Sequence, residues 1–260
     1  MEILTSFATT GAPAFALTLA RVSGVFLMSP VFSSRLIPVR AKLLVALGIT
    51  FAAVPFATGS TPVPDNLAEI AVLAVKEVLV GAALAFSVSL VFAAVAFAGG
   101  LIDLTVGFAF ANVVDPVQNA QISVMGQFYS LLASAVFVAI GGPDMVIAGL
   151  VRSFQVVPVT EMPDWPSLSG AIVGSVSGLF AVGIEVAAPV LVAMLVTDAA
   201  VGFLARIAPQ MNIFSIELPG KVIAMFLLLL VTAPMLVSNI GGQLQQGIAQ
   251  MFRLVLGGPA

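Results

Sequence analysis

The stretch Val78–Ile102 reads VLVGAALAFSVSLVFAAVAFAGGLI and holds no charged residue over 25 positions. As an α-helix it would be about 37 Å long, because each residue adds about 1.5 Å. The hydrocarbon core of a bilayer is only about 30 Å thick. Over the whole chain of 260 residues, 60% are hydrophobic and 8% are charged, whereas about 25% are charged in an ordinary soluble domain. The length of this apolar stretch and the low charge of the whole chain predict an all-α integral membrane protein.

Apolar segments on both sides of this stretch extend the pattern. The spacing of the charged residues predicts six hydrophobic helical segments, at about 13–32, 41–57, 67–101, 123–141, 168–204 and 222–240. The third and the fifth each run about 35 residues, roughly 52 Å as a helix. We therefore expect each of these two to tilt strongly, to break into two pieces or to extend beyond the bilayer. Ala188–Pro189 is the natural break in the fifth segment.

The residue inventory excludes most kinds of catalytic and ligand-binding site. The chain has no Cys and no His, so we expect no thiolate or imidazole metal site and no catalytic group that needs either residue. The net charge of −3 argues against a nucleic-acid-binding protein, because such a protein usually carries an excess of basic residues. The one Gly-Lys pair, Gly220-Lys221, is followed by Val222 and does not complete a phosphate-binding loop. We predict that the protein is not an enzyme and needs no cofactor.

Five ionisable residues fall inside apolar segments, where each costs about 2.5–3.5 kcal/mol to insert. One reading is that they form a path for ions or protons. The other is that they face protein or lie outside the bilayer core, paired with neighbouring subunits. We do not expect Lys76 and Glu77 to pair with each other, because adjacent residues point in different directions from a helix. The five residues are Arg21, Lys76, Glu77, Glu185 and Asp198.

Two segments near predicted helix ends have unusual composition. Asp103–Gln121 is apolar and aromatic but bracketed by carboxylates, and its Asp115-Pro116 pair favours a turn. It is either a pore-facing loop, in which Phe108 and Phe110 obstruct the passage, or a packed turn between helices. After Gly241-Gly242, apolar and polar residues separate onto two helical faces, which predicts an amphipathic C-terminal helix. The apolar face holds Leu244, Ile248, Met251, Phe252 and Val255, and the polar face holds Gln243, Gln246, Gln250 and Arg253.

Three stretches together resemble one family, that of the flagellar biosynthesis protein FliR and its counterparts in virulence-type III secretion. The first runs from Ala-Arg-Val-Ser-Gly at 20–24 through Ser-Pro-Val-Phe at 29–32 to Ile-Pro-Val-Arg at 37–40. The second is Gly-Phe-Ala-Phe-Ala at 107–111 with Asp115-Pro116 after it. The third is Arg-Ile-Ala-Pro-Gln-Met-Asn-Ile-Phe at 206–214 followed by Leu-Pro-Gly-Lys at 218–221. The third block is the most specific, and the resemblance covers essentially the whole chain.

The resemblance implies a subunit of the type III protein export gate in the bacterial inner membrane, at the flagellar basal body. It implies one export-gate domain over 1–260, with a FliP-like helical part at about 1–166. A FliQ-like hairpin and the amphipathic helix would then occupy about 167–260. Much of the subunit would be lifted out of the bilayer plane. The expected partners are FliP-like, FliQ-like and FlhB-like subunits, unfolded protein substrates and membrane lipid, with no nucleic acid.

The resemblance also implies roles for particular residues. The channel plug would consist of Gly107, Phe108, Ala109, Phe110, Ala111, Asp115 and Pro116. The family motif or contacts between subunits would involve Arg21, Pro30, Pro38, Arg206, Pro209, Gln210, Asn212, Phe214, Pro219 and Lys221.

Two other classes of function remain open on the residues themselves. A stand-alone secondary transporter or ion channel would use Glu185 and Asp198 as coupling carboxylates beside a helix broken near Pro189. A purely structural membrane scaffold would have no conducting role. The transporter should purify as a monomer or homodimer, whereas the gate subunit should purify with several different small hydrophobic proteins.

Overall fold

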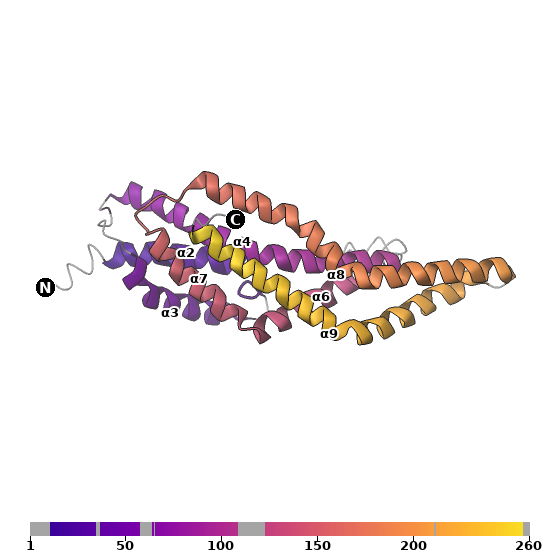
Figure 1. Ribbon diagram of the computed structural model, residues 1–260. Coiled ribbons are helices and arrows are strands. Elements are labelled where there is room, and N and C mark those ends of the chain that lie inside the picture. The colour runs from indigo at the N-terminus through magenta and orange to yellow at the C-terminus, as the bar shows by residue number, and fades with distance from the viewer. Residues whose placement is uncertain are drawn as a thin grey trace. The chain divides into compact units, whose positions relative to one another are not determined.

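The computed structural model describes residues 11–34, 37–57, 64, 66–108, 123–210 and 212–256 (Figure 1). Within these ranges the chain is helical, as the apolar segments predict. Seven α-helices are described there: α2 (Ala12–Met28), α3 (Val39–Ala57), α4 (Leu67–Val106), α6 (Val124–Ala139), α7 (Gly142–Val156), α8 (Trp165–Ile207) and α9 (Ile213–Leu256).

Four of the described helices are long and apolar enough to cross a membrane, and a bent pair makes up to five. The pair is α6 and α7, which meet at an angle of 68°. The expectation of a single helix over 123–141 missed α7, since Asp144 and Arg152 make its stretch less hydrophobic. Gly141 breaks the pair with a φ of +74°, a left-handed conformation that glycine adopts without strain. Pro143 then starts α7 in its first turn, where a missing N–H costs nothing.

The longest helices run without a break where the sequence favoured one. Pro189 lies inside α8, which continues for 43 residues, so the predicted break at Ala188–Pro189 is wrong. Pro219 and Pro234 likewise lie inside α9, which has 44 residues. Such prolines are tolerated where neighbouring helices and side chains compensate the freed backbone groups. Of the three expectations for the long segments, tilting and extension beyond the bilayer remain.

The amphipathic segment after residue 242 is the end of α9 and not a separate helix. Leu244 and Ile248 are buried there, while Gln246 and Gln250 are exposed, as the pattern predicts. Gln243 is the exception, because it is buried although the pattern put it on the polar face. Its amide has a carboxylate partner, described below.

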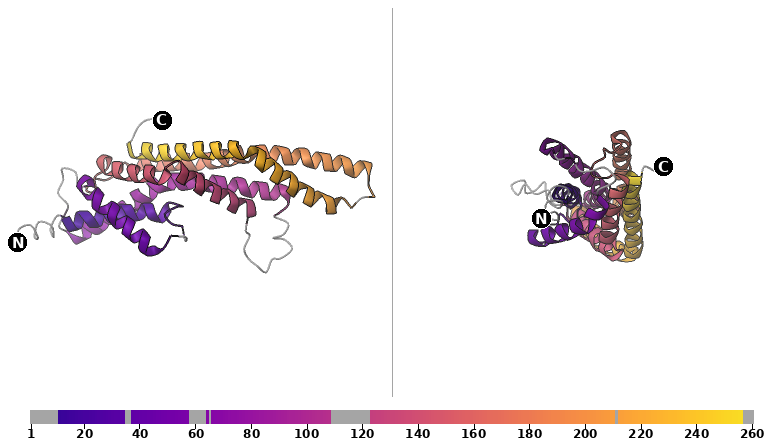
Figure 2. Two further views of the ribbon diagram at one scale, coloured as in Figure 1. Left: turned by 90° about the horizontal axis from the view of Figure 1, so that it is seen from below. Right: turned by 90° about the vertical axis from the view of Figure 1, so that its left-hand side faces the viewer.

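The first of two compact units consists of Met1–Leu90, Gly141–Val176 and Leu244–Ala260. In it α3 packs on both α2 and α7, and Figure 2 shows α2 and α3 side by side. The face that α3 turns inward is made of small residues, and its large side chains point outward. The inward residues are Ala46, Thr50, Ala53 and Ala57.

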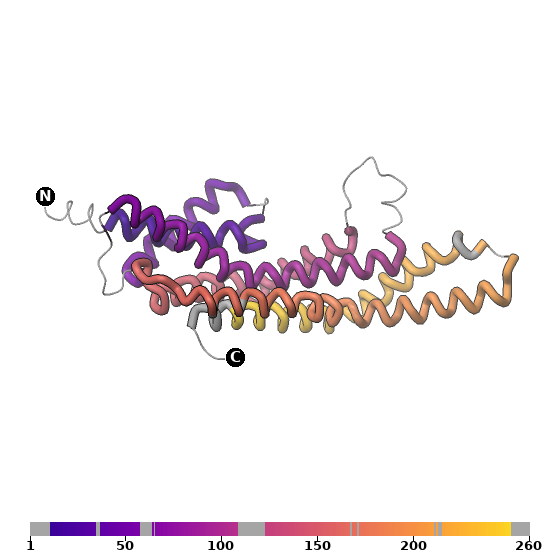
Figure 3. The backbone as a smooth tube through the Cα atoms, turned by 90° about the horizontal axis from the view of Figure 1, so that it is seen from above, coloured from indigo at the N-terminus to yellow at the C-terminus, as the bar shows by residue number. Residues whose placement is uncertain are grey.

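The second unit consists of Val91–Ile140 and Ser177–Gln243. Here α8 and α9 run alongside each other as a hairpin that closes between Ile207 and Ile213 (Figure 3). Aromatic rings pack edge to face between α4 and α6 and between α4 and α8, with centroid distances of 5.6 Å for Phe92–Phe137 and 5.4 Å for Phe97–Phe180. Such pairs stabilise a core beyond the area they bury.

Candidate functional site

Two helices of the first unit, α2 and α4, touch backbone to backbone at Gly24 and Gly81. A Cβ atom on Gly24 would lie 2.9 Å from the backbone nitrogen of Ala82, and one on Gly81 would overlap the carbonyl oxygen of Arg21 and lie 3.0 Å from its carbonyl carbon. Both distances are too short for an ordinary side chain, so the crossing requires glycine. Arg21 precedes Gly24 by about one turn, and Glu77 precedes Gly81 by about one turn. The close approach therefore brings these two charged residues together.

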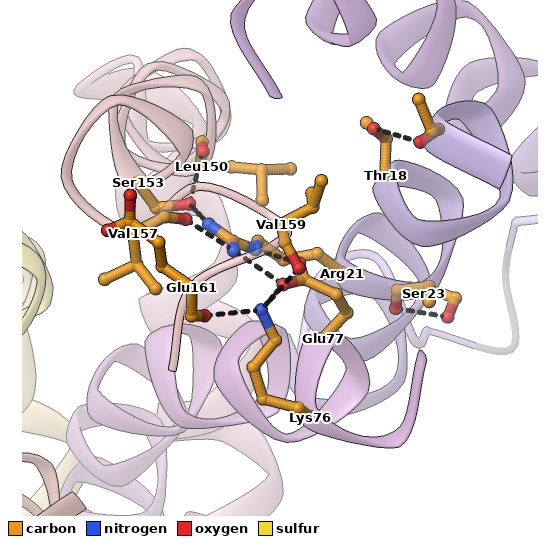
Figure 4. Close-up of polar contacts among 12 residues, drawn as sticks. Thr18, Arg21, Ser23, Lys76, Glu77, Leu150, Ser153, Val157, Val159 and Glu161 are labelled. Carbon is orange, nitrogen blue, oxygen red and sulfur yellow. Dashed lines mark hydrogen bonds and ion pairs between the residues drawn. The ribbon is translucent and has the colours of Figure 1, made fainter. Parts of the chain in front are cut away.

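Arg21 is fully buried and bonded to three elements (Figure 4). Its Nε and Nη2 donate to the two carboxylate oxygens of Glu77, the second bond being 2.8 Å long. Its Nη1 donates to Ser153 Oγ at 3.0 Å, and Nη2 also donates to the carbonyl oxygen of Val157 at 2.7 Å. The ring of Phe154 lies 4.2 Å from Cζ, within reach of a cation–π interaction. A planar guanidinium suits such two-pronged binding of a carboxylate.

Lys76 joins the same cluster from the next position of α4. Its Nζ lies 2.5 Å from Glu77 Oε1, and it donates to the carbonyl oxygens of Val159 and Glu161, each at 2.9 Å. The expectation that Lys76 and Glu77 cannot pair is therefore wrong. The Cβ directions of adjacent residues do diverge, but the four-carbon stem of Lys76 bends its ammonium back to the carboxylate.

The cluster fastens the non-helical segment that follows α7. Three alternate carbonyls of this segment, at Val157, Val159 and Glu161, accept from the two buried cations (Figure 4). The N–H of Val159 also donates to the carbonyl oxygen of Ala57, the last residue of α3, at 3.1 Å. Helices α2, α3 and α4 thus all hold this one segment.

We name Arg21, Lys76 and Glu77 the buried charge cluster. It contains two cations and one carboxylate, and backbone carbonyls supply the remaining acceptors. Its charges pair inside the chain, so these three residues face protein, as the second of the two readings supposed. Because both carboxylate oxygens and the ammonium are already bonded, the geometry favours a role in holding the structure over a path for ions.

The remaining two intramembrane charges lie in the second unit and connect α8 with α9. Gln243 Nε2 donates to Glu185 Oε2 at 3.3 Å. Lys221 Nζ lies 2.7 Å from Asp198 Oδ1 and 2.8 Å from Glu217 Oε1. The side chain of Lys221 is 13% exposed and that of Asp198 is 42% exposed. Glu185 and Asp198, both on α8, thus each have a partner on α9, the other helix of the hairpin.

The most specific sequence block forms the closed end of this hairpin. Arg206 lies in the last turn of α8, the turn follows, and Lys221 lies near the start of α9. The block therefore joins the end of α8 to the first turns of α9. Of the residues expected to contact other subunits, those exposed in this block are Arg206, Pro209, Gln210, Asn212 and Pro219. The side chain of Phe214 lies outside the described part of the chain.

The two prolines of the first block stand at the ends of helices in the first unit. Pro30 lies in the turn after α2, and Pro38 directly precedes α3. These are positions where a residue without a backbone donor fits. That they contact other subunits stays a prediction.

The predicted plug begins within the described residues and continues outside them. Gly107 has a φ of +97°, which favours glycine, and a Cβ there would lie 3.2 Å from Leu218 Cδ1. The second and third sequence blocks thus meet at this point. Phe108 is half-buried. The other plug residues, Ala109, Phe110, Ala111, Asp115 and Pro116, lie outside the described residues.

Asp103 is a structural residue that the sequence reasoning placed in a loop. Helix α4 instead continues to Val106, and the buried carboxylate of Asp103 accepts from Ser123 Oγ at 2.5 Å and from the Met125 N–H at 3.0 Å. It therefore fixes the start of α6. Ser123 directly before an apolar run is a helix-start signal that could have indicated this.

Among the residues with a described position, no three His, Cys, Asp or Glu side chains are grouped to hold a metal ion. The charged groups that do come together there are of opposite sign: Arg21 and Lys76 with Glu77, and Lys221 with Asp198 and Glu217.

Comparison with known proteins extends the agreement over nearly the whole chain. Residues 12–247 match the family described as Bacterial export proteins, family 1. The flagellar biosynthetic protein FliR of Bacillus subtilis is 32% identical over 223 residues, which cover 84% of this chain and 85% of that protein. FliR of Escherichia coli is 33% identical over 201 residues, 77% of each chain. The surface presentation of antigens protein SpaR of Salmonella typhimurium is 28% identical over 231 residues, 86% of this chain and 85% of that protein.

These matches confirm the resemblance that the three sequence blocks predicted. Together with the long apolar helices, they place the protein in the bacterial inner membrane. The chain belongs to the FliR/SpaR family of bacterial export proteins, helical membrane subunits of the type III export gate that carry out transport and not catalysis.

Proposed function

We propose that this subunit completes and seals the channel through which a flagellar export gate passes unfolded flagellar proteins, and that flagellum assembly requires it. The observation that carries the proposal is the family match over residues 12–247. FliR relatives are 28% to 33% identical and SpaR relatives 24% to 28% identical, which favours the flagellar system over the injectisome.

The chain divides by function into a FliP-like part, residues 1–166, and a FliQ-like part, residues 167–260, within one export-gate domain. The α8–α9 hairpin supports the second assignment. Helices of 43 and 44 residues would be about 65 Å long, more than twice the bilayer core, which supports a position partly lifted out of the membrane.

The partners are FliP-like, FliQ-like and FlhB-like subunits. In a hairpin partly lifted out of the bilayer, lipid does not cover exposed apolar side chains, so those of Phe203, Leu230 and Val231, which are 67%, 75% and 79% exposed, support packing against other subunits. Residues of the hairpin's closed end, Arg206 to Lys221, would make part of these contacts.

Residues Gly107–Ala111, with Asp115 and Pro116, form the plug of the channel. Apolar side chains suit this role, because a hydrophobic constriction closes a pore to ions by dewetting. Phe108 and Phe110 would be the obstructing side chains. The left-handed backbone of Gly107, close to Leu218, supports a fixed starting point for the plug.

Purification in mild detergent, followed by mass measurement, tests the proposal. A complex that contains several different small hydrophobic proteins is expected. A lone monomer or homodimer that transports a solute would contradict it and favour the transporter that uses Glu185 and Asp198. The bonds of these two carboxylates to Gln243 and Lys221 already count against that alternative.

A further inference from the structure

Helix α3 differs from the other described helices in length and in the arrangement of its side chains. It has 19 residues, about 28 Å, and so matches the hydrocarbon core of a bilayer. The described helices α4, α8 and α9 have 40 or more residues, and α2, α6 and α7 have 17 or fewer.

The outward face of α3 consists of large apolar side chains, with one basic residue on that face at the N-terminal end of the helix. Positions 40, 44, 47 and 51 follow the helical repeat and share one face. Leu44, Leu47 and Phe51 are 72%, 42% and 77% exposed, and Arg40 is exposed. Within the described part of the chain, Arg40 makes no ion pair.

These features favour lipid over protein as the occupant of this face. Helix–helix contacts in membranes are enriched in small residues, and α3 uses its small residues for the contacts inside this chain. The outward face has large side chains for acyl chains to cover. Arg40, at the end of the apolar stretch, lies where a phosphate headgroup would sit, and a guanidinium binds phosphate with two parallel bonds.

We propose that the Arg40–Phe51 face of α3 binds an anionic phospholipid, whose headgroup phosphate pairs with Arg40 and whose acyl chains lie along Leu44, Leu47 and Phe51. The neighbouring Lys42, also basic and half-buried, strengthens the preference for a negative headgroup. This inference rests on the proposed function, in which the subunit is partly lifted from the bilayer and α3, one of four described helices able to span it, keeps contact with lipid.

Native mass spectrometry of the purified complex in mild detergent tests the proposal. Phosphatidylglycerol and phosphatidylcholine with the same acyl chains are added separately. The wild-type complex is expected to bind phosphatidylglycerol more tightly, and Arg40→Gln should weaken that binding about fivefold, the worth of one basic residue at an anionic membrane surface. Arg152→Gln removes an exposed charge from α7 and serves as the matched control that leaves binding unchanged.

Two further measurements separate lipid from other occupants. Excess inorganic phosphate should not displace the lipid, because the acyl chains contribute to binding. A photo-reactive residue in place of Phe51 should form adducts with phospholipid in cells. Equal binding of the two lipids, an equal effect of both Arg variants, displacement by phosphate, or adducts with protein alone would each overturn the proposal.

Discussion

Arg21 and Glu77 are 56 positions apart in the sequence, and both are fully buried. A buried charge that loses its partner costs about 3–5 kcal/mol. Because the buried charge cluster holds two cations and one carboxylate, Glu77 balances both cations at once. The cluster therefore tolerates the loss of a cation better than the loss of its carboxylate.

The Glu77→Gln variant should lower the free energy of unfolding by about 3 kcal/mol or more, since it leaves Arg21 and Lys76 without a counter-charge. Arg21→Met should cost less, because Lys76 and Glu77 stay paired. The double variant should be more stable than Glu77→Gln alone, as it restores the wild-type net charge. Thermal unfolding in detergent measures all three. A double variant less stable than Glu77→Gln would show that charge balance does not govern this site.

Lys221 should respond differently, although it pairs with two carboxylates. Asp198 is 42% exposed and Glu217 is 35% exposed, and ion pairs in such positions contribute about 1 kcal/mol or less. Lys221→Gln should therefore change the unfolding temperature only slightly in the same assay. A loss of stability as large as that caused by Glu77→Gln would contradict the expectation that the exposed ion pairs contribute less than the buried charge cluster.

At the scale of elements, the crossing of α2 and α4 depends on the absence of side chains. Gly24 and Gly81 allow the two backbones to touch, and the ion pair forms one turn away. Gly48 on α3 is different, since a Cβ there would meet nothing within 4 Å. The two kinds of glycine are not distinguishable from the sequence, because each stands in an apolar helix.

Gly81→Ala should separate α2 from α4 and destabilise the chain by about 1–3 kcal/mol, the usual cost of overpacking. Gly48→Ala is the matched control and should leave stability unchanged or slightly raised, because alanine favours helix. The amount of folded chain in the membrane and its unfolding temperature measure both. Equal effects of the two substitutions would contradict the backbone contact.

Helix existence could be predicted from the sequence better than helix ends. The apolar runs located α3 and the bulk of α4, α8 and α9. Proline and glycine misled the interpretation at Pro189 and at Gly241-Gly242, because helices in an apolar setting continue through residues that end helices in water. Helix α7 escaped notice since its polar residues, among them Arg152, are carried on an exposed side.

At the scale of the whole molecule, the three sequence blocks identified the family, and the long-range contacts of the site could not be predicted. The charges in apolar segments were visible as costly, but the partners of three of them lie on another helix: Glu77 for Arg21, Gln243 for Glu185 and Lys221 for Asp198. Such pairings depend on how helices cross, which periodicity along one helix does not contain. The three blocks identify the family because their residues match its motifs; they do not specify which residues meet in the fold.

The central claim is that the turn beginning at Gly107 blocks a shared channel at rest. Ion conductance of purified gate complexes in planar bilayers tests it most directly, with wild-type complexes compared to complexes that lack Gly107–Ala111. Mass measurement establishes that both contain the same subunits. The account predicts that the deletion raises resting conductance while assembly is unchanged. Unchanged conductance in a fully assembled deletion complex would contradict it.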